Sequence, residues 1–264
     1  MRYEHVLVAT DAGLGTVTMN RPDRRNALSE AHMRELLHAL RTLGDDPDVR
    51  AIVLAANGPV FSAGHDFADM AERDLDGMRK LLAVCTELML TLRRVPQPVV
   101  ARVHALATAA GCQLVASCDL AVAAETAGFA TPGGTGGWFC TTPMVAVARA
   151  VGPKRAAEML YTGEAIDAAT ALAWGLVNRV VPADRLVAET ETLARAASRG
   201  SRASKAAGKA AFWATIDLDV EAAYAHACEV MAATSMTPDG REAVRSFLEK
   251  RPGVYPANRS PAKR

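Results

Sequence analysis

The hydrophobic and polar positions of this chain alternate between short uncharged runs and longer segments with helical spacing. The uncharged run Ala51–Ala56 predicts a strand that is buried on both of its faces. Similar runs predict four more strands, over residues 5–10, 16–20, 98–104 and 119–124. Apolar residues at helical spacing predict helices between them, over residues 29–43, 75–94 and 111–117. Strands that alternate with helices in this way indicate an α/β fold.

From about Pro143 onward the pattern becomes helical. Apolar spacing predicts successive helices over residues 143–150, 153–161, 167–174, 184–198, 202–215, 220–233 and 238–250. Residues 251–260 and the last four residues lack such spacing and predict a mobile tail. The chain is therefore expected to consist of an α/β core followed by a helical C-terminal part.

Two loops of small residues lie where a predicted strand meets a predicted helix. The first covers residues 60–67 and includes Ser62, Ala63 and Gly64; the second covers residues 107–111. Small side chains leave backbone N–H groups bare, and such groups bind anions or an oxygen that becomes an anion during a reaction. We hypothesise that N–H groups from both loops converge on one carbonyl oxygen.

Composition narrows the class of protein. The chain has 264 residues, half of them apolar, and a net charge of +1, which argues against nucleic-acid and membrane-surface partners. Its five cysteines lack CxxC spacing and predict reduced thiols in a cytoplasmic protein. The N-terminus carries Glu4 and Asp11 and no apolar region typical of a signal peptide, and no uncharged apolar run reaches the roughly 20 residues of a membrane span.

Three motifs that would carry other chemistry are incomplete. The glycine-rich residues 133–137 have Phe139 where a dinucleotide-binding loop needs its third glycine, and no P-loop lysine motif occurs. Residues 60–64 have Val60 where a nucleophile elbow needs glycine. The six histidines lack metal-ligand spacing, so no metal site is expected.

An ordered set of short motifs resembles the crotonase superfamily, the enoyl-CoA hydratase/isomerase fold. Each motif is weak by itself, but together they cover about residues 5–250 in the family's order. They are Asn20-Arg21-Pro22 with Asn26-Ala27-Leu28, Phe61-Ser62-Ala63-Gly64-His65-Asp66-Phe67, Pro98-Val99-Val100-Ala101, Gly111-Cys112-Gln113-Leu114 with Cys118-Asp119, Phe129-Ala130-Thr131-Pro132, and Tyr161-Thr162-Gly163 with Ala173-Trp174-Gly175-Leu176-Val177.

The resemblance implies a fold and a ligand. The fold is a spiral of ββα units over residues 1–195, followed by a helical region, residues 196–264, that forms homotrimers or dimers of trimers. The ligand is an acyl-CoA thioester, with coenzyme A as part of the substrate and no separate cofactor. The resemblance places the two oxyanion N–H groups at His65 and Ala110. It also places four residues in the channel for the adenine and pantetheine groups: Ala63, Asp66, Phe67 and Ala68.

The chain departs from the family at the two positions where hydratases carry glutamates. Gln113 and Gly133 stand there, and neither can accept a proton from water. The imidazole of His65 is a possible substitute, although we favour a packing role for it. Four other nearby side chains each have a functional and a structural interpretation: Asp69, Glu72, Cys140 and Trp138. We favour a structural role for the two acids, and we favour a structural role over a nucleophilic one for Cys140. Trp138 and Cys140 would line the acyl pocket, and Asp66 is expected to cap a helix.

Three functions are left open. The first is an acyl-CoA-processing lyase of the enoyl-CoA hydratase type, which stabilises a thioester enolate. The second is an enoyl-CoA isomerase or another crotonase reaction, and the third is an acyl-CoA-binding protein without catalysis. Lys205 and Lys209 on a C-terminal helix could reach a coenzyme A phosphate, although solvation at the surface is the favoured interpretation.

Overall fold

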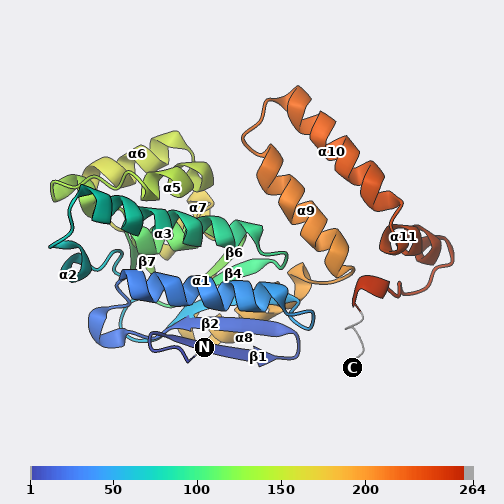
Figure 1. The fold of residues 1–264 in the computed structure, drawn as a ribbon, viewed down its shortest axis with the longest axis horizontal. Helices are drawn as coiled ribbons and strands as arrows, with labels where there is room; N and C mark the ends of the chain where they lie inside the picture. The colour runs from blue at the N-terminus through green and yellow to red at the C-terminus, as the bar shows by residue number, and fades with distance from the viewer. Residues whose placement is uncertain (1, 259–264) are drawn as a thin grey trace.

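A six-stranded sheet organises the structure, a computed structural model that describes residues 2–258 (Figure 1). Its strand order is β1-β2-β3-β4-β6-β9, and all neighbours are parallel except β1 and β2. The strands are β1 (Val6–Asp11), β2 (Leu14–Met19), β3 (Ala51–Ala56), β4 (Val99–Val103), β6 (Leu120–Ala124) and β9 (Arg179–Val181). A second, small sheet contains β5 (Ala107–Thr108), β7 (Gly128–Ala130) and β8 (Ile166–Asp167).

Helices cover both faces of the six-stranded sheet. On one face, Ile52 and Leu54 of β3 join the core formed with α1 (Glu30–Asp45), α3 (Leu75–Arg94) and α4 (Ala110–Ser117). On the other face, Val53 belongs to a smaller core formed with α8 (Leu186–Ala197). Because successive strand residues point to opposite faces, the uncharged run of β3 fills both cores. The predicted α/β class and the predicted burial of β3 are confirmed.

Short strands account for the main differences from the sequence prediction. The region after Pro143 was expected to be wholly helical, yet β8 and β9 lie within it, and β9 forms the edge of the large sheet. Strands of two or three residues are too short to show a period, so the sequence carries no signal for them. The remaining predicted helices follow the prediction to within about two residues at most ends: α5 (Pro143–Val151), α6 (Pro153–Thr162), α7 (Ala168–Trp174), α9 (Arg202–Thr215), α10 (Val220–Ser235) and α11 (Pro238–Leu248). The short helix α2 (Phe67–Met70) begins directly after Asp66.

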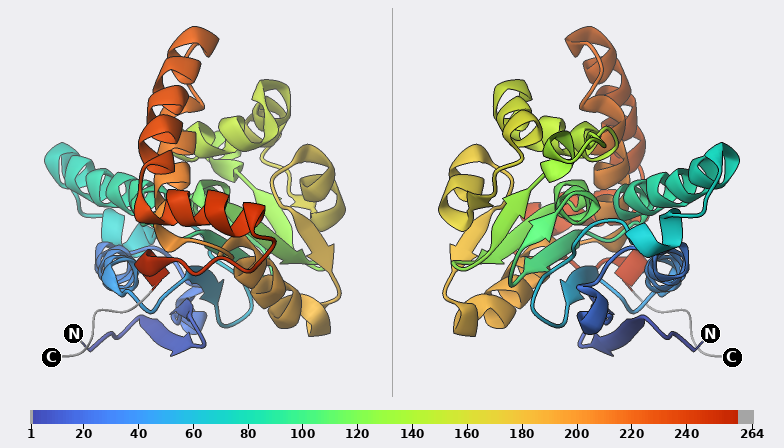
Figure 2. Two further views of the ribbon diagram at one scale, coloured as in Figure 1. Left: turned by 90° about the vertical axis from the view of Figure 1, so that its right-hand side faces the viewer. Right: turned by 90° about the vertical axis from the view of Figure 1, so that its left-hand side faces the viewer.

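The C-terminal helices α9, α10 and α11 stand to one side of the sheet and its covering helices (Figures 1 and 2). The Lys209 ammonium fastens α9 to the core, since it pairs with Asp119 at 2.6 Å and donates to the carbonyls of Leu92 and Gln97. Lys209 is therefore engaged inside the protein, which argues against its suggested role at a coenzyme A phosphate. The predicted boundary after residue 195 falls in the last turn of α8, and the division into core and oligomerisation region stays a prediction.

Residues 251–258 are anchored, so the predicted mobile tail is wrong for this segment. The nearly buried Glu242 of α11 accepts hydrogen bonds from the Arg251 guanidinium and from the Val254 N–H. Asn258 bonds to the backbone of Gly200 and Arg202. The rest of the predicted tail, residues 259–264, lies outside the described residues. No helix within residues 2–258 is long and apolar enough to cross a membrane.

His32 on the buried face of α1 should make stability depend on pH. Burial lowers the pKa of its imidazole from 6.5 to about 4. Below pH 6.5 this imidazole is protonated in the unfolded chain but stays neutral in the folded chain. The free energy of unfolding should therefore decrease between pH 6.5 and about pH 4, by up to about 3 kcal/mol. Urea unfolding across this pH range should show a smaller decrease in the free energy of unfolding for His32→Leu than for the natural chain.

The matched control for that measurement is His38→Gln, on the exposed face of the same helix. This variant should show the same decrease in the free energy of unfolding as the natural chain. An equally steep loss in His32→Leu would show that other groups cause the acid sensitivity.

Candidate active site

The two loops of small residues are in direct contact. Ser62 pairs with Ala107 as an isolated bridge, and the Thr108 N–H donates to the Ser62 carbonyl at 3.0 Å. A Cβ on Gly64 would lie 2.9 Å from the Cβ of Ala109, and a Cβ on Gly111 would lie 2.5 Å from the Ser62 carbonyl oxygen. Glycine at these two positions is what permits the close approach.

A cavity of about 320 Å³ lies where these loops meet. Ala63 and His65 of the first loop line it together with Ala110 of the second, and Gly133 and Trp138 line it as well. No hydrogen bond from the His65 or Ala110 N–H is found among residues 2–258. Ala110 is the first residue of α4, where an N–H has no acceptor within the helix. Both residues that the sequence assigned to the oxyanion site thus lie in one cavity with unpaired donors.

Ala109 precedes this helix in a strained backbone conformation. Its φ is 51° and its ψ is −118°, a combination that residues with a side chain rarely adopt. The Ala109 N–H donates to the Ala130 carbonyl, which holds the loop against the small sheet. The strain sets the direction in which the following peptide, with the Ala110 N–H, leaves the loop.

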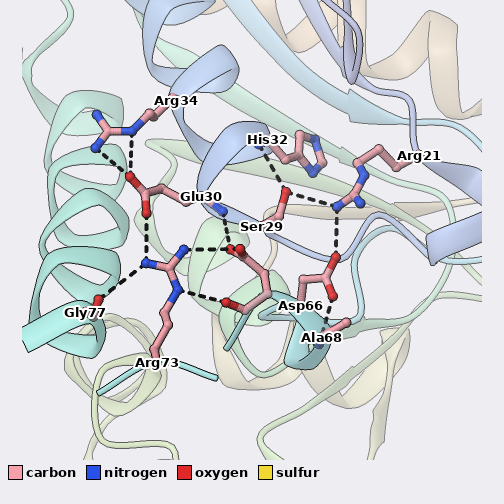
Figure 3. A network of polar contacts seen from close by, with 10 residues as sticks. Arg21, Ser29, Glu30, His32, Arg34, Asp66, Ala68, Arg73 and Gly77 are labelled. Carbon is pink, nitrogen blue, oxygen red and sulfur yellow. Dashed lines mark hydrogen bonds and ion pairs between the residues drawn. The ribbon is translucent and has the colours of Figure 1, made fainter. Parts of the chain in front are cut away.

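Polar contacts hold the short helix α2 beside the cavity (Figure 3). The Asp66 carboxylate caps α2 by accepting from the Ala68 N–H, and it pairs with Arg21 at 3.2 Å. The Asp69 carboxylate accepts from the Glu30 N–H and pairs with Arg73. The predicted capping role of Asp66 is confirmed, and both acids are occupied by structural contacts.

Not every predicted channel residue lines the cavity. Ala63 and Phe67 do, and the Phe67 ring lies edge-on to Trp138 with their centroids 6.3 Å apart. Asp66 and Ala68 do not line it. Their predicted contact with coenzyme A stays a prediction, at the outer side of α2.

The His65 side chain packs rather than presenting a nitrogen to the cavity. Both ring nitrogens are buried and have no hydrogen-bond partner among the described residues. Burial lowers the pKa of the imidazole, although the nearby Leu28 carbonyl and Asp69 carboxylate oppose this. A neutral ring with inaccessible nitrogens is not placed to move a proton, which supports the packing interpretation.

The two positions of the usual glutamates differ in what surrounds them. Gln113 does not line the 320 Å³ cavity but faces a separate one of about 140 Å³. Gly133 does line the first cavity, yet a Cβ there would lie 2.2 Å from the Trp138 carbonyl oxygen and 2.8 Å from Cys140 Sγ. The loop has closed over the place of a side chain at position 133.

Cys140 lines the cavity as an unreactive thiol. Burial raises its pKa, against a weaker opposing effect of the Gly133 N–H, which donates to Sγ at 3.4 Å. A protonated thiol is a poor nucleophile. The geometry therefore supports the structural role that the sequence analysis favoured.

Gly133→Ala tests the closure of this loop. We expect it to lower the free energy of unfolding by about 1–3 kcal/mol, because a methyl group would overlap the Trp138 carbonyl oxygen. The matched control is Gly136→Ala, where the nearest atom is 4.0 Å from the new Cβ and φ is −108°. Chemical unfolding should show the control within about 0.5 kcal/mol of the natural chain. Equal stability of the two variants would contradict the closed loop.

Known proteins are similar to this chain in both sequence and architecture. A mitochondrial enoyl-CoA hydratase domain-containing protein 3 from Mus musculus is 42% identical over 244 residues, which cover 92% of this chain and 81% of the mouse protein. A probable enoyl-CoA hydratase, echA8, from Mycobacterium bovis is 34% identical over 95% of this chain and 97% of its own length.

Solved structures of related proteins superpose closely on this chain. The crystal structure of an enoyl-CoA hydratase from Mycobacterium smegmatis superposes with a TM-score of 0.92 at 49% identity, covering 95% of this chain and 98% of that one. The human enoyl-CoA hydratase domain-containing protein 3 superposes with a TM-score of 0.91 at 41% identity, covering 95% and 100%. The family model described as enoyl-CoA hydratase/isomerase matches residues 9–258. The predicted crotonase-like fold is confirmed, and the chain belongs to the enoyl-CoA hydratase/isomerase family.

Proposed function

We propose that this chain binds an acyl-CoA thioester and holds the carbonyl oxygen between the N–H groups of His65 and Ala110. It would then act as an acyl-CoA-processing enzyme of the enoyl-CoA hydratase type, with a thioester enolate as the stabilised species. One observation carries the proposal: two unpaired backbone donors belong to residues that line the same largely apolar cavity.

The chemistry follows from these donors. A thioester carbonyl gains negative charge when its enolate forms, and fixed N–H groups stabilise that charge without reorganising. An oxyanion donor typically contributes about 3 kcal/mol to a transition state. The apolar walls strengthen the effect because they exclude water and lower the local dielectric.

A second candidate is an acyl-CoA-binding protein without catalysis. Among the described residues, no aspartate or glutamate lines the cavity, and the nitrogens of His65 are inaccessible. Each missing acid or base lowers a rate by roughly 10²–10⁴-fold. Isomerisation is supported least, since it requires a carboxylate over the acyl chain.

Parallel measurements separate the candidates. Hydration of crotonyl-CoA is measured by absorbance, and binding of butyryl-CoA is measured by calorimetry. Turnover would support the enzyme, and binding without turnover would support the acyl-CoA-binding protein. If neither turnover nor binding is observed, both candidates are contradicted.

Replacing the ligand's carbonyl tests the oxyanion site directly. S-butyl-CoA, a thioether without the carbonyl oxygen, should bind at least about tenfold more weakly than butyryl-CoA, because it leaves both donors unpaired. Ala110→Pro should remove this difference in part, since proline at the first helical position deletes the N–H but is compatible with the helix.

Ala110→Gly is the matched control for that variant, because it keeps the N–H and should keep the preference for the thioester. Circular dichroism verifies that both variants fold. Equal affinities of thioester and thioether for the natural chain would contradict the proposed contact, whatever the variants do.

We also propose that the C-terminal helices mediate assembly into a homotrimer or a dimer of trimers. Large apolar side chains of α10 and α11 are exposed in the single chain, with Phe247 at 82% and Met231 at 77%. Large apolar side chains exposed on neighbouring helices are typical of an interface.

Phe247→Asp should therefore lower the mass measured by light scattering from that of three or six chains toward one, since it buries an unpaired charge in the interface. Val187→Asp, at a half-exposed position of α8 away from these helices, should leave the mass unchanged. A natural chain that runs as a monomer would show the proposal to be wrong.

A further inference from the structure

Aromatic side chains gather at the first cavity, the one of about 320 Å³ that His65 and Ala110 line. Only 5% of the whole chain is phenylalanine, tryptophan or tyrosine, with six phenylalanines and three tryptophans. Two of those phenylalanines and one of those tryptophans line this single cavity, as Phe67, Phe139 and Trp138. A chain that is poor in aromatic rings has therefore concentrated them at its candidate site.

Two of these rings are left partly uncovered. Phe67 is 71% exposed and Trp138 is 45% exposed, whereas Phe61 and Phe129 in the core are fully buried. Unlike the exposed ring of Phe247 on α11, these two rings also line a cavity. Large apolar side chains that stay exposed beside a cavity are typical of a surface that a ligand covers.

The loop before Trp138 holds this residue in place. The Gly133 carbonyl accepts hydrogen bonds from the N–H groups of both Gly136 and Trp138, each at 3.2 Å. The next ring, Phe139, packs on Tyr161 of α6 with the centroids 5.5 Å apart. A ring that is already fixed loses little conformational entropy when a ligand packs against it, so it contributes more to affinity.

Trp138 also lies next to the proposed oxyanion donor. Its ring centroid is 6.3 Å from that of His65, whose backbone N–H is proposed to hold the thioester oxygen. The acyl group of a thioester continues directly from the carbonyl carbon. A carbonyl held by His65 therefore brings the first atoms of the acyl group into the part of the cavity that the Trp138 ring lines.

Size and chemistry together favour an aromatic occupant. A cavity of about 150 Å³ is enough to bind benzene, so 320 Å³ has room for an aromatic ring together with the thioester group. Among the described residues, no aspartate, glutamate, lysine or arginine lines the cavity. Two aromatic rings in edge-on or offset contact gain about two- to tenfold in affinity beyond what their buried area provides, and an alkyl group lacks this gain.

We propose that the first cavity takes an arylacyl group, an acyl group with an aromatic ring close to the thioester, and that Trp138 selects it. The inference rests on the proposed binding of an acyl-CoA and specifies the class of acyl group. Trp138 acts here as a binding residue, since its indole packs against the substrate and takes no part in proton transfer.

The test compares aromatic ligands with their saturated counterparts by calorimetry. Benzoyl-, phenylacetyl- and 3-phenylpropanoyl-CoA are paired with cyclohexanecarbonyl-, cyclohexylacetyl- and 3-cyclohexylpropanoyl-CoA, and coenzyme A is the same in both members of a pair. Burial alone would favour the saturated ring, because its apolar surface is larger. At one spacer length or more, the aromatic ligand should nevertheless bind at least about threefold more tightly.

Three variants test the role of Trp138. Trp138→Leu should lower the affinity ratio within a pair to one or less, whereas Trp138→Phe keeps a ring and should keep the preference for the aromatic ligand. Trp174→Leu, on α7 and outside the lining of the cavity, is the matched control for loss of a tryptophan and should also keep it. Circular dichroism verifies that each variant folds.

The other outcomes contradict the inference in ways that can be told apart. A ratio below about threefold at all three spacer lengths would overturn the aromatic preference, while measurable binding of the same ligands would leave the proposed function intact. A ratio that survives Trp138→Leu would overturn the assignment to Trp138. If neither these ligands nor butyryl-CoA bind to the natural chain, the proposed function fails together with this inference.

Discussion

The candidate site depends on the close approach of two backbone segments. Residues 62–64 and 107–111 come from different strand–helix connections, and their contact is possible because Gly64 and Gly111 have no side chains between the loops. Any Cβ at Gly111 would overlap the Ser62 carbonyl. The same contact brings His65 and Ala110 to one cavity, and no hydrogen bond from either N–H is found among residues 2–258.

The surrounding structure stabilises this arrangement at some distance. The parallel strands β3 and β4 end beside the two loops, and the helices that follow pack against each other on one face of the sheet. The Arg21–Asp66 pair (Figure 3) and the Asp69–Arg73 pair hold α2 in place. The charged side chains near the cavity thus make contacts that stabilise the local backbone. They do not line the cavity, whose walls remain largely apolar.

Among the described residues, no aspartate or glutamate lines the first cavity, and the space beside position 133 is filled. Gly133 is not a vacant position, because the Trp138 carbonyl and Cys140 occupy the space that a side chain would need. Gln113 lines a separate cavity of about 140 Å³. Family membership therefore fixes the backbone framework of the candidate site more firmly than it fixes a reaction, because a reaction depends on side chains.

The sequence alone determined the elements whose patterns are long. Burial of β3, the bounds of α3 and α9 and the capping of α2 by Asp66 follow from local spacing and residue type, and the ordered motifs determined the family. Tertiary structure alone decided the features that depend on contacts between distant segments: the strands β8 and β9, the anchoring of residues 251–258, the pairing of Lys209 with Asp119 and the closure over Gly133. The orientation of Gln113 also belongs here, because nothing along the chain states which of two cavities its amide faces. Local patterns encode which face of an element is apolar, whereas a contact between residues far apart in sequence exists only once the chain has folded.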